Sequence, residues 1–261
     1  MKYTPRRMDD SAAENSSGGG PSGTFKEMAT LVTLIVVSLV GLFLIISFLT
    51  DLAVSRISVE KEREIFGKLR SHLAVETEIP EEYSEEWDQV QQVMDKLMAY
   101  DGVVDLDYEL VFVQNPEPNA FAFPGGNIGI TSGLLDSLEG EIPIAFVISH
   151  ELGHFAHRDH LKGIGRRLGF TVAISIIFGG GPDAVTFKGA ELMLLSYSRK
   201  QESKADEFAV HCIDTIYGHH EGAGQLFEIL DSESELPSWA YMFSTHPDSK
   251  ERLRRLEEGW E

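Results

Sequence analysis

A continuous charge-free run near the amino terminus is the strongest constraint on how this chain can fold. No acidic or basic residue lies between Glu27 and Asp51, and residues 28–50 are mainly Leu, Val, Ile and Phe. As a helix, these roughly 23 residues are about 34 Å long, slightly more than the ~30 Å hydrocarbon core of a bilayer. A signal-peptide core is shorter, about 7–15 residues, and is followed by a small-residue cleavage site. The run therefore predicts one retained transmembrane helix over residues 28–50.

The anchor divides the chain into parts of different character. Residues 1–27 are polar and rich in Gly and Ser, which predicts a disordered leader. Residues 51–261 are sufficient for one globular domain with its own core. The net charge of -20 argues against nucleic acid as a partner, and the single cysteine, Cys212, excludes an internal disulfide framework.

Apolar periodicity and turn residues indicate an α+β fold that is predominantly helical. Spacings of three and four residues predict helices over 59–73, 87–100, 141–157, 191–213, 224–230 and 250–257. Alternation predicts short strands over 108–114, 119–123 and 127–130, which we expect to form a small antiparallel sheet. The apolar stretch 168–178 is too short to span a bilayer, so we expect it to be buried, with a membrane-dipping segment as the alternative.

The sequence His150-Glu151-Leu152-Gly153-His154 points to a metal site. Residues four apart share one face of a helix, so both histidines can reach one zinc ion. Glu151 is turned toward the side of that face and can act as general base on the attacking water. Two surface histidines on an ordinary helix are the alternative, but the preceding turns are apolar, which favours a buried catalytic site.

A third protein ligand is required, and two residues can supply it. His160 stands where metzincins carry their third histidine, but His157 replaces the glycine that lets the chain leave the helix sharply. Glu202 can ligate instead, while Asp206, one helical turn later, fixes the tautomer of a ligating histidine. Exposed acids on a helix that also carries basic residues are the alternative, but a His-His-Glu set completes a catalytic zinc site with an open position.

Four ordered segments carry a family resemblance beyond the metal-binding pattern. They are HELGH at 150–154, SRKQESKAD at 198–206, NAFAFPGG at 119–126 and THPDSKER at 245–252. Together with the anchor, they resemble the HtpX and CAAX prenyl protease type 1 family of zinc metalloendopeptidases. The resemblance implies a gluzincin fold with one Zn²⁺ per chain, Glu202 as third ligand, and proteolysis near a membrane in protein quality control. Asp248, where the family commonly has a second proline, is a local departure. The single anchor argues against prenyl-protein processing, because several relatives span the membrane repeatedly.

Two further groups of residues are candidates for the chemistry. The resemblance places His246 near the active site, where it can hydrogen-bond the oxyanion of the tetrahedral intermediate; a histidine packed in a loop is the alternative. Asn119, Ala120 and Phe121 can bind an extended substrate as an edge strand. For these three, a strand buried in its own sheet is the alternative.

These observations favour an anchored zinc endopeptidase that acts on unfolded or membrane-proximal polypeptides. The lipid bilayer is the partner of residues 28–50, and a homo-oligomer is compatible with the sequence. Basic residues flank the anchor on both sides, so charge does not decide orientation. We expect a single pass through a bacterial inner membrane, with the catalytic domain on the periplasmic side. A catalytically silent metal-binding chaperone or adaptor is the main alternative, and a metallohydrolase acting on a non-protein amide is another.

Overall fold

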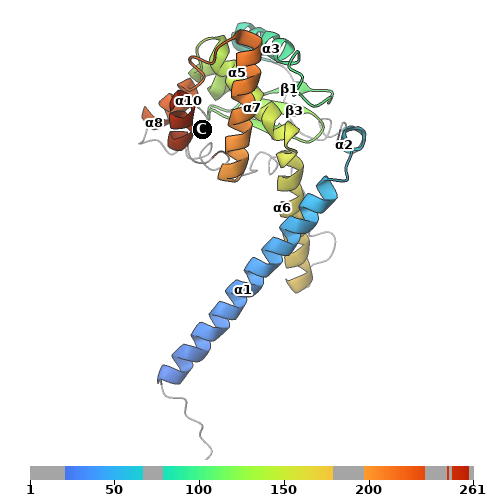
Figure 1. The fold of residues 1–261 in the computed structure, drawn as a ribbon, viewed down its shortest axis with the longest axis vertical. Coiled ribbons are helices and arrows are strands. Elements are labelled where there is room, and N and C mark those ends of the chain that lie inside the picture. The colour runs from blue at the N-terminus through green and yellow to red at the C-terminus, as the bar shows by residue number, and fades with distance from the viewer. Residues whose placement is uncertain (1–20, 67–78, 179–196, 233–245, 247–248, 259–261) are drawn as a thin grey trace, which may run out of the picture. The chain divides into compact units, whose positions relative to one another are not determined.

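The computed structural model of the 261-residue chain describes residues 21–66, 79–178, 197–232, 246 and 249–258 (Figure 1). Contacts divide the chain into two compact units, Met1–Ile45 and Ile46–Glu261. Among the described residues, the first unit contains only the larger part of helix α1. The elements that form the candidate site all belong to the second unit.

Helix α1 (Pro21–Val54) contains the predicted anchor. In the part of the chain that the structure describes, it is the one helix long and apolar enough to cross a membrane, over Phe25–Val54. Few of its side chains are buried, whereas the core helix of a soluble protein is mostly buried. The helix begins at Pro21, so residues 21–27 of the predicted leader are helical. Residues 1–20 lie outside the described part.

Three helical segments lead from α1 to the sheet: α2 (Val59–Phe66), the short 3-10 helix η3 (Glu81–Tyr83) and α3 (Ser84–Leu97). Helix α2 confirms the start of the predicted helix 59–73, whose remainder lies outside the described residues. Helix α3 buries an apolar stripe at three- and four-residue spacing, as the periodicity predicts: Trp87, Val90, Val93, Met94 and Leu97.

The three predicted strands form one sheet: β1 (Glu109–Val113), β2 (Ala120–Phe123) and β3 (Asn127–Thr131). Their order is β1-β3-β2, so β3 is central. Strands β2 and β3 are antiparallel, and they are joined by a tight turn in which Gly125 and Gly126 both have positive φ angles. Strand β2 is thereby left at one edge of the sheet.

The prediction of an antiparallel sheet is correct for β2 and β3 but wrong for β1, which pairs parallel to β3. After β1 the chain crosses to the far edge of the sheet, where it forms β2. It then turns back, and β3 fills the place between β1 and β2. Hydrogen bonds between Asn115 and Ser132 hold this crossing, because the Asn115 amide donates to Ser132 Oγ at 3.1 Å. The sheet is therefore mixed, within a fold that is α+β and predominantly helical.

Six helices follow the sheet among the described residues: α4 (Ser132–Ser137), α5 (Glu141–Ala156), α6 (Asp159–Phe178), α7 (Arg199–Tyr217), α8 (Gln225–Ser232) and α10 (Ser249–Glu258). Thr131 caps α4 by accepting a hydrogen bond from the Leu134 amide. Ser198 and Gln201 form a capping box that begins α7 at Arg199. The predicted helix 191–213 therefore included two residues, 197 and 198, that precede the helix in the structure. Its residues 191–196 lie outside the described part.

Helix α5 is the centre of the core of the second unit and is buried on nearly every side from Pro143 to Phe155. It packs against α3, α7 and strand β2 (Figure 1). The close approach of α5 and α7 depends on Gly153. A Cβ atom at this position would lie 2.9 Å from Ala205 Cα, which is closer than carbon atoms pack. The second helix of the site can therefore reach α5 because residue 153 has no side chain.

Helix α6 differs from the prediction of a buried segment over 168–178. Leu168 is 39% exposed and Val172 40% exposed, because only one face of the helix is packed. That face contains Gly165 and Gly169, where added Cβ atoms would lie 2.6 Å from Thr50 Cγ2 and 2.7 Å from Ile46 Cγ2, respectively. The last turns of α1 thus pack directly on the glycine face of α6. The membrane-dipping alternative stays a prediction.

The crossing of α5 and α7 gives a test of the fold. We expect Gly153→Ala to lower the free energy of unfolding by about 1–3 kcal/mol, because the methyl group forces the two helices apart. Gly41→Ala is the matched control, since nothing lies within 4 Å of a Cβ at that position. Urea unfolding of the full chain in detergent measures the free energy of unfolding of both variants and of the parent. Equal stability of the Gly153 variant and the parent would contradict the proposed packing.

Candidate metal centre

The two histidines of the HELGH sequence lie one turn apart on α5, and both are buried. Their Nε2 atoms are 3.1 Å apart. His150 Nδ1 lies 2.8 Å from Asp206 Oδ1, and His154 Nδ1 lies 3.3 Å from Asp159 Oδ2. Because each carboxylate accepts a hydrogen bond from Nδ1–H, the Nε2 lone pair is left free to bind a metal.

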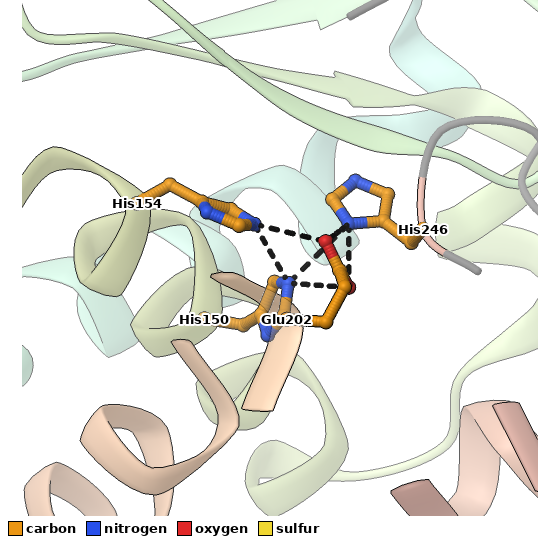
Figure 2. Close-up of side chains that lie close together, drawn as sticks. All are labelled: His150, His154, Glu202 and His246. Carbon is orange, nitrogen blue, oxygen red and sulfur yellow. Dashed lines mark hydrogen bonds and ion pairs between the residues drawn. The ribbon is translucent and has the colours of Figure 1, made fainter. Parts of the chain in front are cut away.

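Glu202 enters the same space from the first turn of α7 (Figure 2). Its Oε1 is 3.5 Å from His154 Nε2, and its Oε2 is 3.5 Å from His150 Nε2. The side chain is 1% exposed, which rules out the alternative of an acid on a solvated helix face. The structure therefore brings together the three residues that the sequence predicts as metal ligands.

His246 completes this cluster. Its Nδ1 lies 3.2 Å from Glu202 Oε1 and 3.4 Å from His150 Nε2. One ligand atom from each of His150, His154, Glu202 and His246 lies within 4.8 Å of all the others. This position agrees with the prediction that His246 lies near the other candidate residues, and its role as an oxyanion donor stays a prediction.

The spacing of the donor atoms fits a small divalent metal. Ligands at 2.0–2.2 Å from a tetrahedral ion are separated from each other by about 3.3–3.6 Å. The two histidine Nε2 atoms are 3.1 Å apart, and each of them lies 3.5 Å from a different oxygen of the Glu202 carboxylate. Two imidazoles and one carboxylate are also a donor set that zinc prefers. The residues present therefore fit zinc.

Arg252, on α10, joins the two carboxylates of α7 and was not identified from the sequence. Its Nε and Nη2 donate to Asp206 at 2.8 and 2.7 Å, and its Nη1 lies 2.7 Å from Glu202 Oε2. Burial alone would raise the pKa of Asp206, but the Arg252 guanidinium and its hydrogen bonds hold that pKa at about 2. The pKa of Asp206 in the folded state is thus below its ordinary value of 3.8. The ionised Asp206 therefore contributes its full stabilisation of the folded state above pH 3.8, and this contribution is lost as the pH falls from 3.8 toward 2.

Two further residues hold His154 and were also missed. Tyr197 stacks on the His154 imidazole with ring centroids 3.8 Å apart, and Asp159 binds its Nδ1. Burial would lower the pKa of His154, but the hydrogen bonds that its ring donates to Asp159 and Glu202 raise this pKa to about 9. A metal ion that binds at neutral pH therefore competes with a proton on His154. A carboxylate five residues after the second histidine was the available sequence signal.

Glu151 has the environment that a general base requires. It is 1% exposed, and its Oε2 has no hydrogen-bond partner among the described residues. Its Oε1 lies 3.7 Å from His246 Nε2. A cavity of about 20 Å³ is lined in part by Glu151, His150, His246 and Ala120, and such a volume accommodates one water molecule. The cavity beside Glu151 can therefore hold one water molecule.

The three residues predicted to bind substrate differ in their positions. Ala120 lines the cavity beside Glu151. Phe121 points to the opposite face of the sheet, where it packs with Phe123 and Val111. The Asn119 amide donates a hydrogen bond to Thr131 Oγ1, and the Asn119 carbonyl accepts one from the Thr131 amide. The Oδ1 atom of Asn119 is buried without a partner among the described residues. Only Ala120 of the three reaches the cavity.

His160, the alternative third ligand, is directed elsewhere. Its Nε2 lies 2.7 Å from Glu62 Oε1, and it is not part of the four-residue cluster. The chain does leave the helix near this point without a glycine, because Arg158 adopts a positive φ of 58°. The turn nevertheless presents Asp159, rather than His160, to His154.

Comparison with known proteins gives an independent result. The model of peptidase family M48 matches residues 84–259, more than half of the chain. The mitochondrial metalloendopeptidase OMA1 of Schizosaccharomyces pombe is 31% identical over 177 residues, which cover 65% of this chain and 51% of the relative. The metalloprotease LoiP of Escherichia coli is 30% identical over 145 residues, or 53% and 57% of the two chains. A protease HtpX homolog of Sulfurovum is 28% identical over 192 residues, or 57% and 68%.

The chain spans about half the length of the S. pombe relative, so the likeness concerns the part that contains the cluster. The matched family agrees with the HtpX-type resemblance of the four sequence segments. The buried cluster, the mainly helical fold and the family match lead to one conclusion: the chain belongs to peptidase family M48.

Proposed function

We propose that the chain is a zinc-dependent endopeptidase in which His150, His154 and Glu202 hold the metal. One observation carries this proposal: three metal-compatible donors, 3.1–3.5 Å apart, adjoin a buried glutamate with a free oxygen. A zinc ion bound there supplies Lewis acidity and lowers the pKa of water to about 7. A purely structural site requires the ligands but not Glu151, so this residue favours the enzyme over a silent chaperone or adaptor.

The residues divide the catalytic work as follows. Glu151 accepts a proton from the attacking water and then delivers it to the leaving amine. His246 donates a hydrogen bond to the oxyanion of the tetrahedral intermediate. Asp206 and Asp159 keep His150 and His154 in the tautomer whose Nε2 is free, and Arg252 keeps Asp206 and Glu202 ionised.

The edge strand β2 supports a peptide substrate rather than a small amide. The Thr131 amide donates to the Asn119 carbonyl, and in an antiparallel pair such bonded positions alternate. The backbone groups of Ala120 and Ala122 therefore point toward the outer edge of β2. An extended polypeptide that pairs there is held mainly by its backbone, which gives broad sequence tolerance. Unfolded or membrane-proximal proteins are the substrate class, and protein quality control is the role.

The cellular setting forms part of the same proposal. Helix α1 crosses the bilayer once, and the catalytic domain lies on the periplasmic side of a bacterial inner membrane. Its apolar length and exposed side chains support the crossing, and the bacterial source of several relatives supports this setting. A homo-oligomer is compatible with this arrangement.

The role of Glu151 is tested by its isosteric amide. We expect Glu151→Gln to lower the rate of cleavage of a casein-like unfolded protein by about 10²–10⁴-fold, because the base is lost. Zinc content should not change. The exposed Glu139→Gln should cleave as fast as the parent. Undiminished cleavage by the Glu151 variant would show that this carboxylate is not the base.

The metal ligands are tested by chelator competition. Glu202→Ala should weaken zinc binding by more than the ~10–100-fold that loss of a supporting residue causes, because a ligand is removed. Glu207→Ala is the matched control, since Glu207 lies on the same helix but is exposed. Retention of zinc by the Glu202 variant at parental affinity would contradict the His-His-Glu assignment.

Two alternative roles for His246, oxyanion donor and fourth metal ligand, are distinguished by kinetics together with zinc affinity. As an oxyanion donor, it predicts that His246→Ala lowers kcat about 10²–10³-fold with unchanged zinc affinity. As a fourth ligand it would close the open position, so the same variant would bind zinc more weakly and cleave faster. We expect the first result. His211→Ala, at an exposed position on α7, controls for the loss of a histidine elsewhere.

A further inference from the structure

The turn between α5 and α6 determines where Asp159 points. Arg158 has a φ of 58°, which side-chain-bearing residues adopt infrequently. This conformation ends α5 and starts α6 at Asp159, whose Oδ2 comes to lie 3.3 Å from His154 Nδ1. The contact between Asp159 and a proposed metal ligand therefore depends on an unfavourable backbone conformation that other groups must hold.

Glu62, on α2, binds both sequence neighbours of Asp159. Its Oε2 accepts a hydrogen bond from Arg158 Nη2 at 2.8 Å, and its Oε1 lies 2.7 Å from His160 Nε2. The guanidinium of Arg158 also donates to the Ile57 carbonyl, just before α2. One carboxylate thus fixes the residues on either side of Asp159.

The surroundings of Glu62 keep it charged and in place. Glu62 is 2% exposed and His160 is fully buried. Burial would raise the pKa of Glu62, but His160 and Arg158 outweigh it, so this pKa lies below its usual value. Tyr108 also faces the group: burial raises the pKa of Tyr108, and the nearby Glu62 charge raises it further. A buried carboxylate with two cationic or hydrogen-bonding partners is costly to displace.

We propose that Glu62 is a positioning residue for the metal centre. By holding Arg158 and His160 it keeps Asp159 on His154, and through Asp159 it fixes the His154 ring for the metal. Because α2 begins five residues after α1 ends, Glu62 also makes the ligand geometry depend on the docking of the segment next to the anchor. This inference rests on the proposed metal centre, although Glu62 touches neither the metal ligands nor the substrate.

The test compares Glu62→Gln with Glu64→Gln in the full chain in detergent. Glu64 lies on the same helix but is exposed. We expect Glu62→Gln to weaken zinc binding about tenfold, as loss of a supporting contact does. The visible absorption of the cobalt-substituted protein should also change, which a loss of stability alone would not cause. Glu64→Gln should match the parent in both measurements.

A double variant tests the route through Asp159. In an Asp159→Asn background, Glu62→Gln should have no further effect on zinc affinity, whereas independent effects would multiply and overturn the inference. Should Glu62→Gln lack a cooperative unfolding transition, His160→Leu replaces it, because leucine cannot hydrogen-bond to Glu62 Oε1 while Arg158 stays paired with Glu62. Its expected effect is a smaller weakening of zinc binding, and parental affinity would overturn the inference.

The outcomes also separate this inference from the proposed function. A parent chain that binds zinc, with a folded Glu62→Gln variant that binds it equally tightly, overturns the positioning role alone. A parent chain that binds no zinc overturns the proposed metal centre and the positioning role together.

Discussion

The candidate site depends on the close crossing of α5 and α7. At Gly153 the two helices approach so closely that a Cβ atom would meet Ala205 at 2.9 Å. Only at this separation can the carboxylate of Glu202 reach both histidine Nε2 atoms of α5 at 3.5 Å. The glycine of HELGH is thus required for packing. It lies between the two histidine ligands and lets α7 come close enough for Glu202 to reach them.

Charge balance explains why the site suits a divalent cation. The carboxylates of Glu151, Glu202 and Asp206 are buried, and the guanidinium of Arg252 pairs with Glu202 and Asp206. With the histidines neutral, as metal binding requires, these groups leave an excess of negative charge in a region where unpaired charge is unfavourable. A zinc ion held by His150, His154 and Glu202 would compensate this excess. The same argument explains why Arg252 spans Glu202 and Asp206 instead of pairing with one.

The sequence predicted what regular geometry determines. Spacing of four residues on a helix identified both histidines of α5. The same spacing made Glu202 and Asp206 on α7 candidates, and the need for a third ligand together with the family resemblance favoured them over exposed acids. The alternation pattern located the three strands. Arg252 was not found, because no periodicity relates α10 to a carboxylate 46 residues earlier. Asp159 was not found because the left-handed turn at Arg158 has no glycine to signal it. The parallel pairing of β1 depends on a chain crossing that strand patterns do not encode.

Zinc K-edge X-ray absorption on the zinc-loaded full chain tests the central claim most directly. The account predicts a first shell of two imidazole nitrogens and carboxylate or water oxygen at about 2.0–2.2 Å, without sulfur. A shell that contains sulfur, or one of oxygen atoms alone without imidazole scattering, would contradict the assignment of His150, His154 and Glu202 as the metal ligands.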